Sequence, residues 1–196
     1  MAIHSADGAD PRTILTSRAE SAELLWPAPD TLILASKRSD RSGTDLTAVS
    51  TEGDLLPFMT NRESLEFIWS RDGRYLLFSY FVPGSGVGLW YRDMSTGAEV
   101  PLGLATGARK CAWHPAGLSV TCGIPSKTSL VNGVSSAMTA TLDDIVTLDI
   151  AEGKEHRSYV ARQGVFLGVI DPLVSSSGNH FVFTNLFDKK AYSLEL

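Results

Sequence analysis

"FIWSRDGRYLLFS", residues 67–79, is the stretch that decides the fold of this chain. Two runs of apolar and aromatic residues flank a polar segment that ends in Gly73. Such runs are typical of short strands, and the glycine supplies the positive φ that a tight hairpin loop needs. The stretch therefore predicts a β-hairpin, and the fold depends on whether this hairpin occurs once or repeats.

The hairpin recurs along the chain. Its other copies read "LLWPAPDTLILAS" at 24–36, "CAWHPAGLSVTCG" at 111–123 and, without the aromatic residue, "PLVSSSGNHFVFT" at 172–184. Trp26, Trp69 and Trp113 lie 43 and then 44 residues apart. A regular spacing of this size indicates a structural repeat, and we expect these three rings to pack between neighbouring sheets.

A second motif is interleaved with the first. "LWYRDMSTG" at 89–97 resembles "IVTLDIAEG" at 145–153, and weaker copies occur at 46–53 and 2–8. Each copy ends in a glycine that precedes another short run of strand-forming residues, and no long segment shows the apolar spacing of a helix. Four short antiparallel strands in a repeat of about 40–45 residues are typical of a β-propeller blade. The predicted fold class is all-β, with about four blades of four antiparallel strands.

The motif also carries a family resemblance. "WSRDG" at 69–73, followed by an apolar strand and then by "LWYRDMSTGAEVPL", resembles the TolB-like propeller repeat, a relative of WD repeats. The family pattern reads W-S-P-D-G, and "WHPAG" at 113–117 keeps its proline but lacks its aspartate. The resemblance covers nearly the whole chain and implies a protein-interaction platform of the bacterial periplasm or cell envelope. Propellers host unrelated activities, so the resemblance implies fold more strongly than function.

The phase of the repeats bears on whether the propeller is closed. We expect one domain, 1–196, with repeat units at 1–15 (partial), 16–60, 61–105, 106–161 and 162–196 (partial). We favour an arc, or the C-terminal part of a larger propeller. The alternatives are a closed four-bladed ring, in which residues 10–16 pair with 189–196, and a different all-β arrangement. Open strand edges of an arc would pair with the remaining blades, or with a second copy through self-association.

Bulk composition excludes some classes of function. Of the 196 residues, 43% are hydrophobic and 20% charged, as in ordinary globular domains. The formal charge of −5 and the lack of a basic run argue against a nucleic-acid partner. The first ten residues do not resemble a signal peptide, and the apolar segment 164–174 is too short to span a membrane.

Groups that could carry chemistry are few and scattered. His4, His114, His156 and His180 lie in different repeats, and no G-x-S-x-G motif is present. We therefore predict no enzyme, no catalytic, cofactor-binding or metal-binding residue, and no cofactor. "GSGVG" at 84–88 precedes a strand rather than a helix, so we read it as a connecting loop and not as a phosphate site.

Two cysteines flank the third hairpin. A three-residue loop over 115–117 would place Cys111 opposite Thr121 and Cys122 opposite Lys110, with the two sulfur atoms on opposite faces of the sheet. We therefore expect two thiols that pack as small apolar groups, because a disulfide would need a bulge that shifts the register.

Four carboxylates invite a structural interpretation. Asp143 and Asp144 are neighbours on a strand, where adjacent side chains face opposite ways, so they are expected to mark a strand start rather than to form an acid–base pair. Asp93 and Asp149 each lie four residues before a glycine, and we expect each to hold its turn through side-chain hydrogen bonds.

The predicted interaction surface combines residues of a strand and of a long loop. Trp90 and Tyr91 are adjacent on a strand, so their rings must face opposite ways and one of them is a candidate for partner contact. The third repeat carries an insertion at 125–142, expected as a long loop between its second and third strands. Trp90, Tyr91, Asn132 and Met138 are the predicted interaction residues.

The sequence therefore predicts a non-enzymatic protein-interaction or scaffolding module. The competing hypothesis is the accessory propeller of a larger enzyme, such as a serine peptidase, whose catalytic domain lies outside these residues. A neighbouring α/β domain with a nucleophile elbow in the complete gene would favour the enzyme, and an anchor or signal would favour the scaffold.

Overall fold

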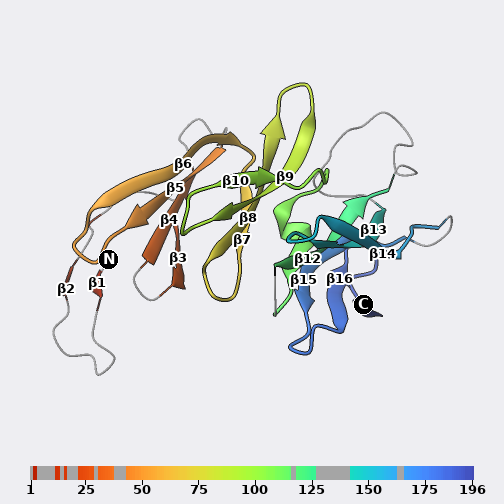
Figure 1. Ribbon diagram of the computed structural model, residues 1–196. Coiled ribbons are helices and arrows are strands. Elements are labelled where there is room, and N and C mark those ends of the chain that lie inside the picture. Colours follow the sequence, from red (N-terminus) through yellow and green to blue (C-terminus); the bar gives the residue numbers. More distant parts are fainter. Residues whose placement is uncertain are drawn as a thin grey trace. The chain divides into compact units, whose positions relative to one another are not determined.

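The computed structural model consists of β-strands and one short 3₁₀ helix, η1 (Ala108–Lys110), among the residues that it describes (Figure 1). Those residues are 2–3, 12–13, 16, 22–28, 31–37, 43–115, 118–126, 142–162 and 166–196. The predicted all-β class is confirmed. The chain forms two compact units, residues 1–65 and 66–196, which are described separately. The expectation of a single domain stays a prediction.

The first unit contains a short two-stranded sheet and a four-stranded sheet. Strands β1 (Ala2–Ile3) and β2 (Arg12–Thr13) pair with each other. The larger sheet is an antiparallel meander of β3 (Ala22–Ala28), β4 (Thr31–Lys37), β5 (Gly43–Val49) and β6 (Leu55–Glu63). Ile33 on β4 and Leu46 on β5 are fully buried in it.

The second unit contains three antiparallel sheets, each a meander in chain order. The first is formed by β7 (Glu66–Trp69), β8 (Tyr75–Val82), β9 (Gly86–Asp93) and β10 (Glu99–Pro101). The second is formed by β11 (Cys111–Trp113), β12 (Ser119–Pro125), β13 (Asp143–Asp149) and β14 (Lys154–Tyr159). The third has β15 (Val169–Val174), β16 (His180–Asn185) and β17 (Ala191–Glu195). The four strands of each complete sheet agree with the predicted pattern. So does β17, which is the third strand of the last, partial repeat.

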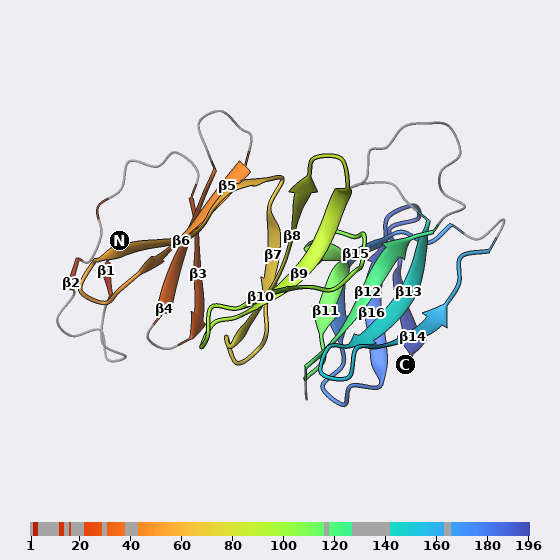
Figure 2. The same cartoon turned by 45° about the horizontal axis from the view of Figure 1, so that its top comes forward.

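The sheets of the second unit stack face to face. One apolar cluster joins the β7–β10 sheet to the β11–β14 sheet, with Leu77 and Leu89 against Val120 and Leu148. A second cluster joins the β11–β14 sheet to the β15–β17 sheet, whose strands lie behind those of the β11–β14 sheet in Figure 2. Strands β11, β12 and β13 of the middle sheet are therefore covered on both faces, whereas most of β14 is exposed. Burying each large apolar side chain contributes about 1.5–3 kcal/mol, so this stacking dominates the stability of the unit.

The segment that connects the β7–β10 sheet to the β11–β14 sheet is hydrogen-bonded to both sheets. The Thr106 hydroxyl donates to the Gly123 carbonyl oxygen at 2.6 Å, and the Ala108 N–H donates to Ser79 Oγ at 2.8 Å. Both hydroxyl groups are buried, and each bond satisfies a group that could not reach water. The segment thus crosses from sheet to sheet along a defined path.

Two of the repeated hairpins, β7–β8 and β15–β16, share one turn chemistry. The Ser70 N–H donates to the Tyr75 carbonyl, and Ser70 Oγ accepts from the Tyr75 N–H, both at 2.8 Å. Ser175 makes the equivalent bonds in the β15–β16 turn. Gly73 and Gly178 have φ of 70° and 80°, as predicted for the closing glycine of the motif. The serine after the aromatic position is therefore a turn cap.

The turns after β9 and β13 are held by aspartate side chains, as predicted. Asp93 Oδ1 accepts from the Ser95 N–H at 2.8 Å, and Asp149 Oδ1 accepts from the Glu152 N–H at 2.9 Å. Hydrogen bonds from the Ser95 hydroxyl and N–H hold the pKa of the Asp93 carboxyl below its ordinary value of 3.8. The role assigned to both aspartates is confirmed.

The structure overturns the prediction for the two cysteines. Cys111 lies directly opposite Cys122, and the two residues form a disulfide. The His114 N–H donates to the Ser119 carbonyl at 3.0 Å, so the loop spans four residues, 115–118, rather than three. One additional loop residue shifts the register by one place, and this shift brings both sulfur atoms to the same face.

The insertion in the third repeat lies where it was predicted. Pro125 ends β12 opposite Asp143, which begins β13, and the Ser126 N–H donates to the Leu142 carbonyl at 2.8 Å. The two ends of the excursion are therefore adjacent at one end of the sheet. Residues 127–141, with Asn132 and Met138, lie outside the described part of the chain.

Reduction of the disulfide should destabilise the second unit. Opening the link between β11 and β12 releases the unfolded chain from a constraint, which corresponds to a loss of about 2–4 kcal/mol in the free energy of unfolding. Urea unfolding with and without dithiothreitol measures the loss, and the Cys111→Ala/Cys122→Ala variant should not respond to the reductant. Two reactive thiols in the denatured, non-reduced protein would contradict the assignment.

Candidate functional site

A surface pocket of about 510 Å³ lies between the β7–β8 turn and the loop that joins β11 to β12. It is lined by Ser70, Arg71, Asp72, Arg74, Tyr75, Trp113, His114, Pro115 and Leu118. This volume is within the range of small-ligand sites, and both walls belong to the second unit. The pocket is the candidate functional site.

Aromatic rings form the base of the pocket. The rings of Tyr75 and Trp113 are tilted against each other with centroids 6.0 Å apart, and Tyr91 meets Tyr75 edge-on at 6.2 Å. The Trp113 indole N–H donates to the Ile68 carbonyl at 3.5 Å, which links β11 to β7. Trp113 therefore packs between two sheets, as predicted, and also presents ring surface to the pocket.

The charged residues of the pocket all come from the β7–β8 turn. The Arg74 guanidinium lies 4.9 Å from the Tyr75 ring centroid and 3.5 Å from an Asp93 oxygen, and its side chain is 56% exposed. Asp72 Oδ1 accepts from the Ser70 hydroxyl at 2.6 Å and from the Arg74 N–H at 3.1 Å. These bonds, led by the one from Ser70, hold the pKa of the Asp72 carboxyl below its ordinary 3.8. Asp72 is thus engaged in stabilising the turn.

His114 replaces the capping serine in the third repeat. Its Nε2 lies 2.8 Å from Thr121 Oγ1, which in turn lies 2.8 Å from Thr147 Oγ1. Burial lowers the pKa of the imidazole below its ordinary 6.5, so the ring is neutral at pH 7. The side chain is therefore a neutral, hydrogen-bonded wall of the pocket.

The structure describes two of the four predicted interaction residues and does not bring these two together. Trp90 and Tyr91 face opposite sides of the β7–β10 sheet, as expected: Trp90 stacks on Tyr80 at 4.4 Å, whereas Tyr91 supports the base of the pocket. A Cβ at Gly88 would lie 2.4 Å from the Trp90 ring, so only glycine permits this stacking. Asn132 and Met138 fall outside the described residues, and the proposed grouping of all four stays a prediction.

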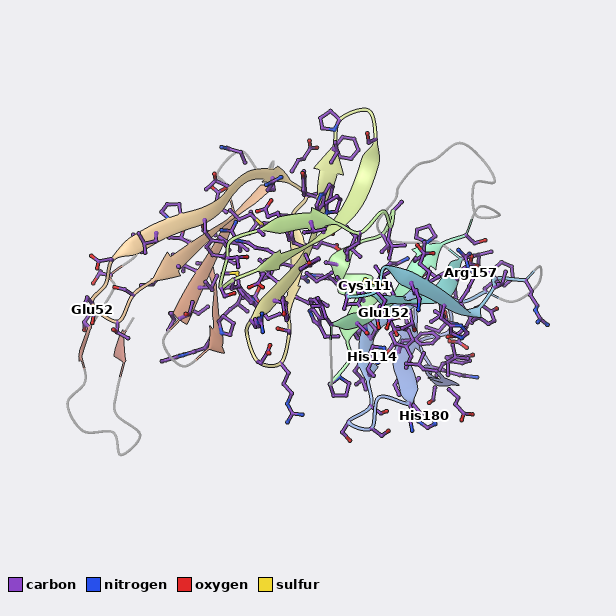
Figure 3. The ribbon with its side chains drawn as sticks, in the orientation of Figure 1. Glu52, Cys111, His114, Glu152, Arg157 and His180 are labelled. Carbon is purple, nitrogen blue, oxygen red and sulfur yellow. A yellow bond between two sulfur atoms is a disulfide. The ribbon has the colours of Figure 1, made fainter. Side chains whose placement is uncertain are left out.

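Asp143 and Asp144 each form an ion pair, on opposite faces of the sheet. Lys110 Nζ lies 2.7 and 2.8 Å from the two Asp143 oxygens, and the Val169 N–H donates to Asp143 at 2.7 Å. On the opposite face, Asp144 pairs with Arg157. Figure 3 labels Arg157, which reaches this face from β14. The two carboxylates face opposite ways, as predicted.

The other histidines and tryptophans singled out in the sequence lie at exposed or half-buried positions where the structure describes them. His180 is exposed at the start of β16, as expected, and His156 is exposed on β14, whereas His4 lies outside the described residues. Trp69 is half-buried, but the Trp26 side chain is 56% exposed, so the prediction of an enclosed ring is wrong for Trp26.

Two further searches concern only the described residues. They contain no group of three or more His, Cys, Asp or Glu side chains that could hold a metal ion. They also contain no helix long and apolar enough to cross a membrane.

The sequence-based reasoning missed the pocket. In the sequence, Arg71 and Arg74 are part of the polar segment of a hairpin, and His114 is one of four histidines in different repeats. The available signal was the repeat itself, because residues at the same place in consecutive units come side by side when the sheets stack. Figure 3 labels His114 just beyond β11, at the end of the sheet where this juxtaposition occurs.

Comparison with solved structures confirms the predicted TolB-like β-propeller fold. The chain is similar to a TolB from Acinetobacter baumannii, at 16% identity and a TM-score of 0.56, covering 99% of this chain and 48% of that one. It is similar to a putative TolB from Agrobacterium tumefaciens, at 18% identity and a TM-score of 0.61, covering 99% of this chain and 65% of that one. It is also similar to the β-propeller domain of the Trilobed protease from Pyrococcus furiosus, described as having an open velcro topology. The identity is 16% and the TM-score 0.57, and the match covers 99% of this chain and 60% of that one.

These likenesses concern the fold alone, because all three identities are below one fifth. The chain spans between about half and two thirds of the length of each of these proteins. No family model and no curated protein matches the sequence.

Removing the carboxylate of Asp143 should be strongly destabilising. Asp143→Ala leaves the Lys110 ammonium buried without this counter-ion, at an expected cost of about 3–5 kcal/mol in chemical unfolding. The double variant Lys110→Met/Asp143→Leu removes both charges and should recover part of that loss. Glu152→Gln, which removes one partner of an exposed ion pair with Lys154, is the matched control and should change stability little. An Asp143→Ala protein as stable as this control would contradict the assigned role.

Burial of His114 should make stability fall in mild acid. Because the folded-state pKa is lowered, the unfolded chain takes up a proton near pH 6.5 that the folded chain does not, so stability is complete above 6.5 and declines below it. Thermal unfolding at pH 7.5 and 5.5 should show a larger decrease for the wild type than for His114→Gln. Equal decreases would show that the histidine does not contribute.

Proposed function

We propose that this chain is a non-enzymatic protein-interaction module of β-propeller type that contacts its partner through the pocket between the β7–β8 and β11–β12 turns. The observation that supports this most directly is the pocket itself, which combines tryptophan, tyrosine and arginine side chains. These three residue types dominate the energetics of protein interfaces. The TolB-like fold supports the same class of function by resemblance.

The pocket is held in place before any partner arrives. Ser70 and Asp72 fix the β7–β8 turn, and His114 is bonded to Thr121 on the neighbouring strand. A site whose side chains are already ordered loses less conformational entropy on binding. This rigidity favours recognition of a short partner segment over a loose surface encounter.

An envelope setting is supported by the disulfide as well as by the resemblance. Disulfides persist in oxidising compartments and are rare in the cytosol of ordinary bacteria. The buried Cys111–Cys122 bond therefore supports an envelope or periplasmic location for the working protein. The remaining blades of a larger propeller, or a second copy, are proposed as further partners of the strand edges. A sedimentation mass of one chain, 21.1 kDa, would argue against pairing between copies.

A second candidate function is the accessory propeller of a larger enzyme. It is supported by the likeness to the propeller domain of the Trilobed protease. The complete gene discriminates between the two: a nucleophile-bearing α/β domain beside these residues would favour the enzyme.

The proposal is tested by capture experiments with the intact parent protein. Pro115→Trp fills the pocket from its exposed rim, and Glu155→Trp adds the same ring at an exposed position on β14 as a matched control. We expect partner capture, quantified by mass spectrometry, to fall at least tenfold for Pro115→Trp and to be unchanged for Glu155→Trp. Capture that is equal in all three proteins would contradict the pocket as the contact site.

A further inference from the structure

We infer that the pocket recognises a carboxylate carried by a partner peptide, together with an apolar side chain beside it. The inference rests on the proposed function and assigns a ligand class to the same site. It is carried by three features of the pocket: the balance of charge on its rim, the stacking of one arginine, and the apolar character of the opposite wall.

The rim has a surplus of positive charge. Arg71 and Arg74 line the pocket. Asp72 already accepts two hydrogen bonds within its own turn, and Asp93, outside the lining, lies 3.5 Å from Arg74. Arg71 makes no ion pair with any residue in the described part of the chain, so the positive charge without an ion-pair partner is that of Arg71. In a protein of net charge −5, such a rim is a local exception and would attract an anionic group.

Arg74 is arranged to bind a planar acceptor. Its guanidinium lies over the Tyr75 ring at 4.9 Å, and its contact with Asp93 is long, at 3.5 Å. A guanidinium stacked on an aromatic face keeps its N–H donors at the edge of its plane, where a carboxylate can accept two parallel hydrogen bonds. The stacking also restrains the side chain, so less entropy is lost when the anion binds.

The opposite wall favours an apolar neighbour. Trp113, Pro115 and Leu118 supply apolar surface, and His114 remains neutral because burial disfavours its charged form. A volume of about 510 Å³ accommodates a few side chains of a peptide rather than a folded domain. The occupant is therefore a short segment in which an acidic group adjoins an apolar residue.

Such a carboxylate has two sources, an internal Asp or Glu side chain and a free C-terminus. Two matched pairs of synthetic peptides distinguish them. The first pair is acetyl-Gly-Gly-Phe-Glu-Phe-Gly-amide and its Glu→Gln counterpart. The second pair is acetyl-Gly-Gly-Phe-Phe with a free C-terminus and the same peptide as the amide. Isothermal titration with the full chain measures all four affinities.

At least one carboxylate peptide should bind tenfold or more tightly than its neutral counterpart, and this preference should weaken as salt rises. The variant Arg71→Gln/Arg74→Gln should lose the preference. Arg109→Gln, which changes an exposed arginine of η1 outside the pocket, should keep it. Thermal unfolding of each variant verifies that it is folded. Equal binding within both pairs, or a preference that survives in Arg71→Gln/Arg74→Gln, overturns the inference.

The proposed function can fail separately. If partner capture is lost with Pro115→Trp but persists with Arg71→Gln/Arg74→Gln, the pocket is the contact site and the carboxylate inference is wrong. If both variants capture the partner normally while the peptide preference holds, the pocket binds carboxylates but does not recruit that partner.

Discussion

Burial of strands β11, β12 and β13 on both faces is the constraint on which the second unit depends. Val120, Cys122 and Leu148 face one neighbouring sheet, and Ala112 and Ile145 face the other. Thr121 and Asp143 on the central strands of this sheet are fully buried, so each needs a partner within the protein. This explains why the Lys110 ammonium and the Asp143 carboxylate occur together at the edge of this layer. The pair is a consequence of close stacking, and catalysis is not needed to account for it.

The same stacking creates the pocket. When two sheets of a repeat pack face to face, their equivalent turns come side by side, and differences between the copies become differences between the two walls. The β7–β8 turn keeps the serine, aspartate and glycine of the motif and adds two arginines, whereas the next copy has His114 and Pro115. A charged wall therefore faces a largely apolar one. The difference between the two walls of the pocket arises at positions where the copies of the repeat differ, and the scaffold is stabilised at positions where they agree.

The repeat-level features were predictable because they depend on local chemistry. Positive φ at Gly73 and Gly178 and the hydrogen bonds of Asp93 and Asp149 follow from residue type and spacing alone. The alternation of Trp90 and Tyr91 follows from strand geometry. The disulfide could not be predicted in this way, because loop length sets the register and a four-residue loop cannot be distinguished from a three-residue one by composition. The pocket needs the packing of two sheets, which no single motif encodes.

The register of one strand pair connects the disulfide to the candidate site. Cys111 and Trp113 lie on the same face of β11, so the register that places Cys111 opposite Cys122 also places Trp113 opposite Val120. A slip of one residue would turn Trp113 to the other face and remove the base of the pocket. It would also break the alignment that brings His114 Nε2 to Thr121 Oγ1. The covalent bond therefore selects the register in which the turns of adjacent sheets form the pocket, so its contribution to the candidate site is geometric as well as energetic.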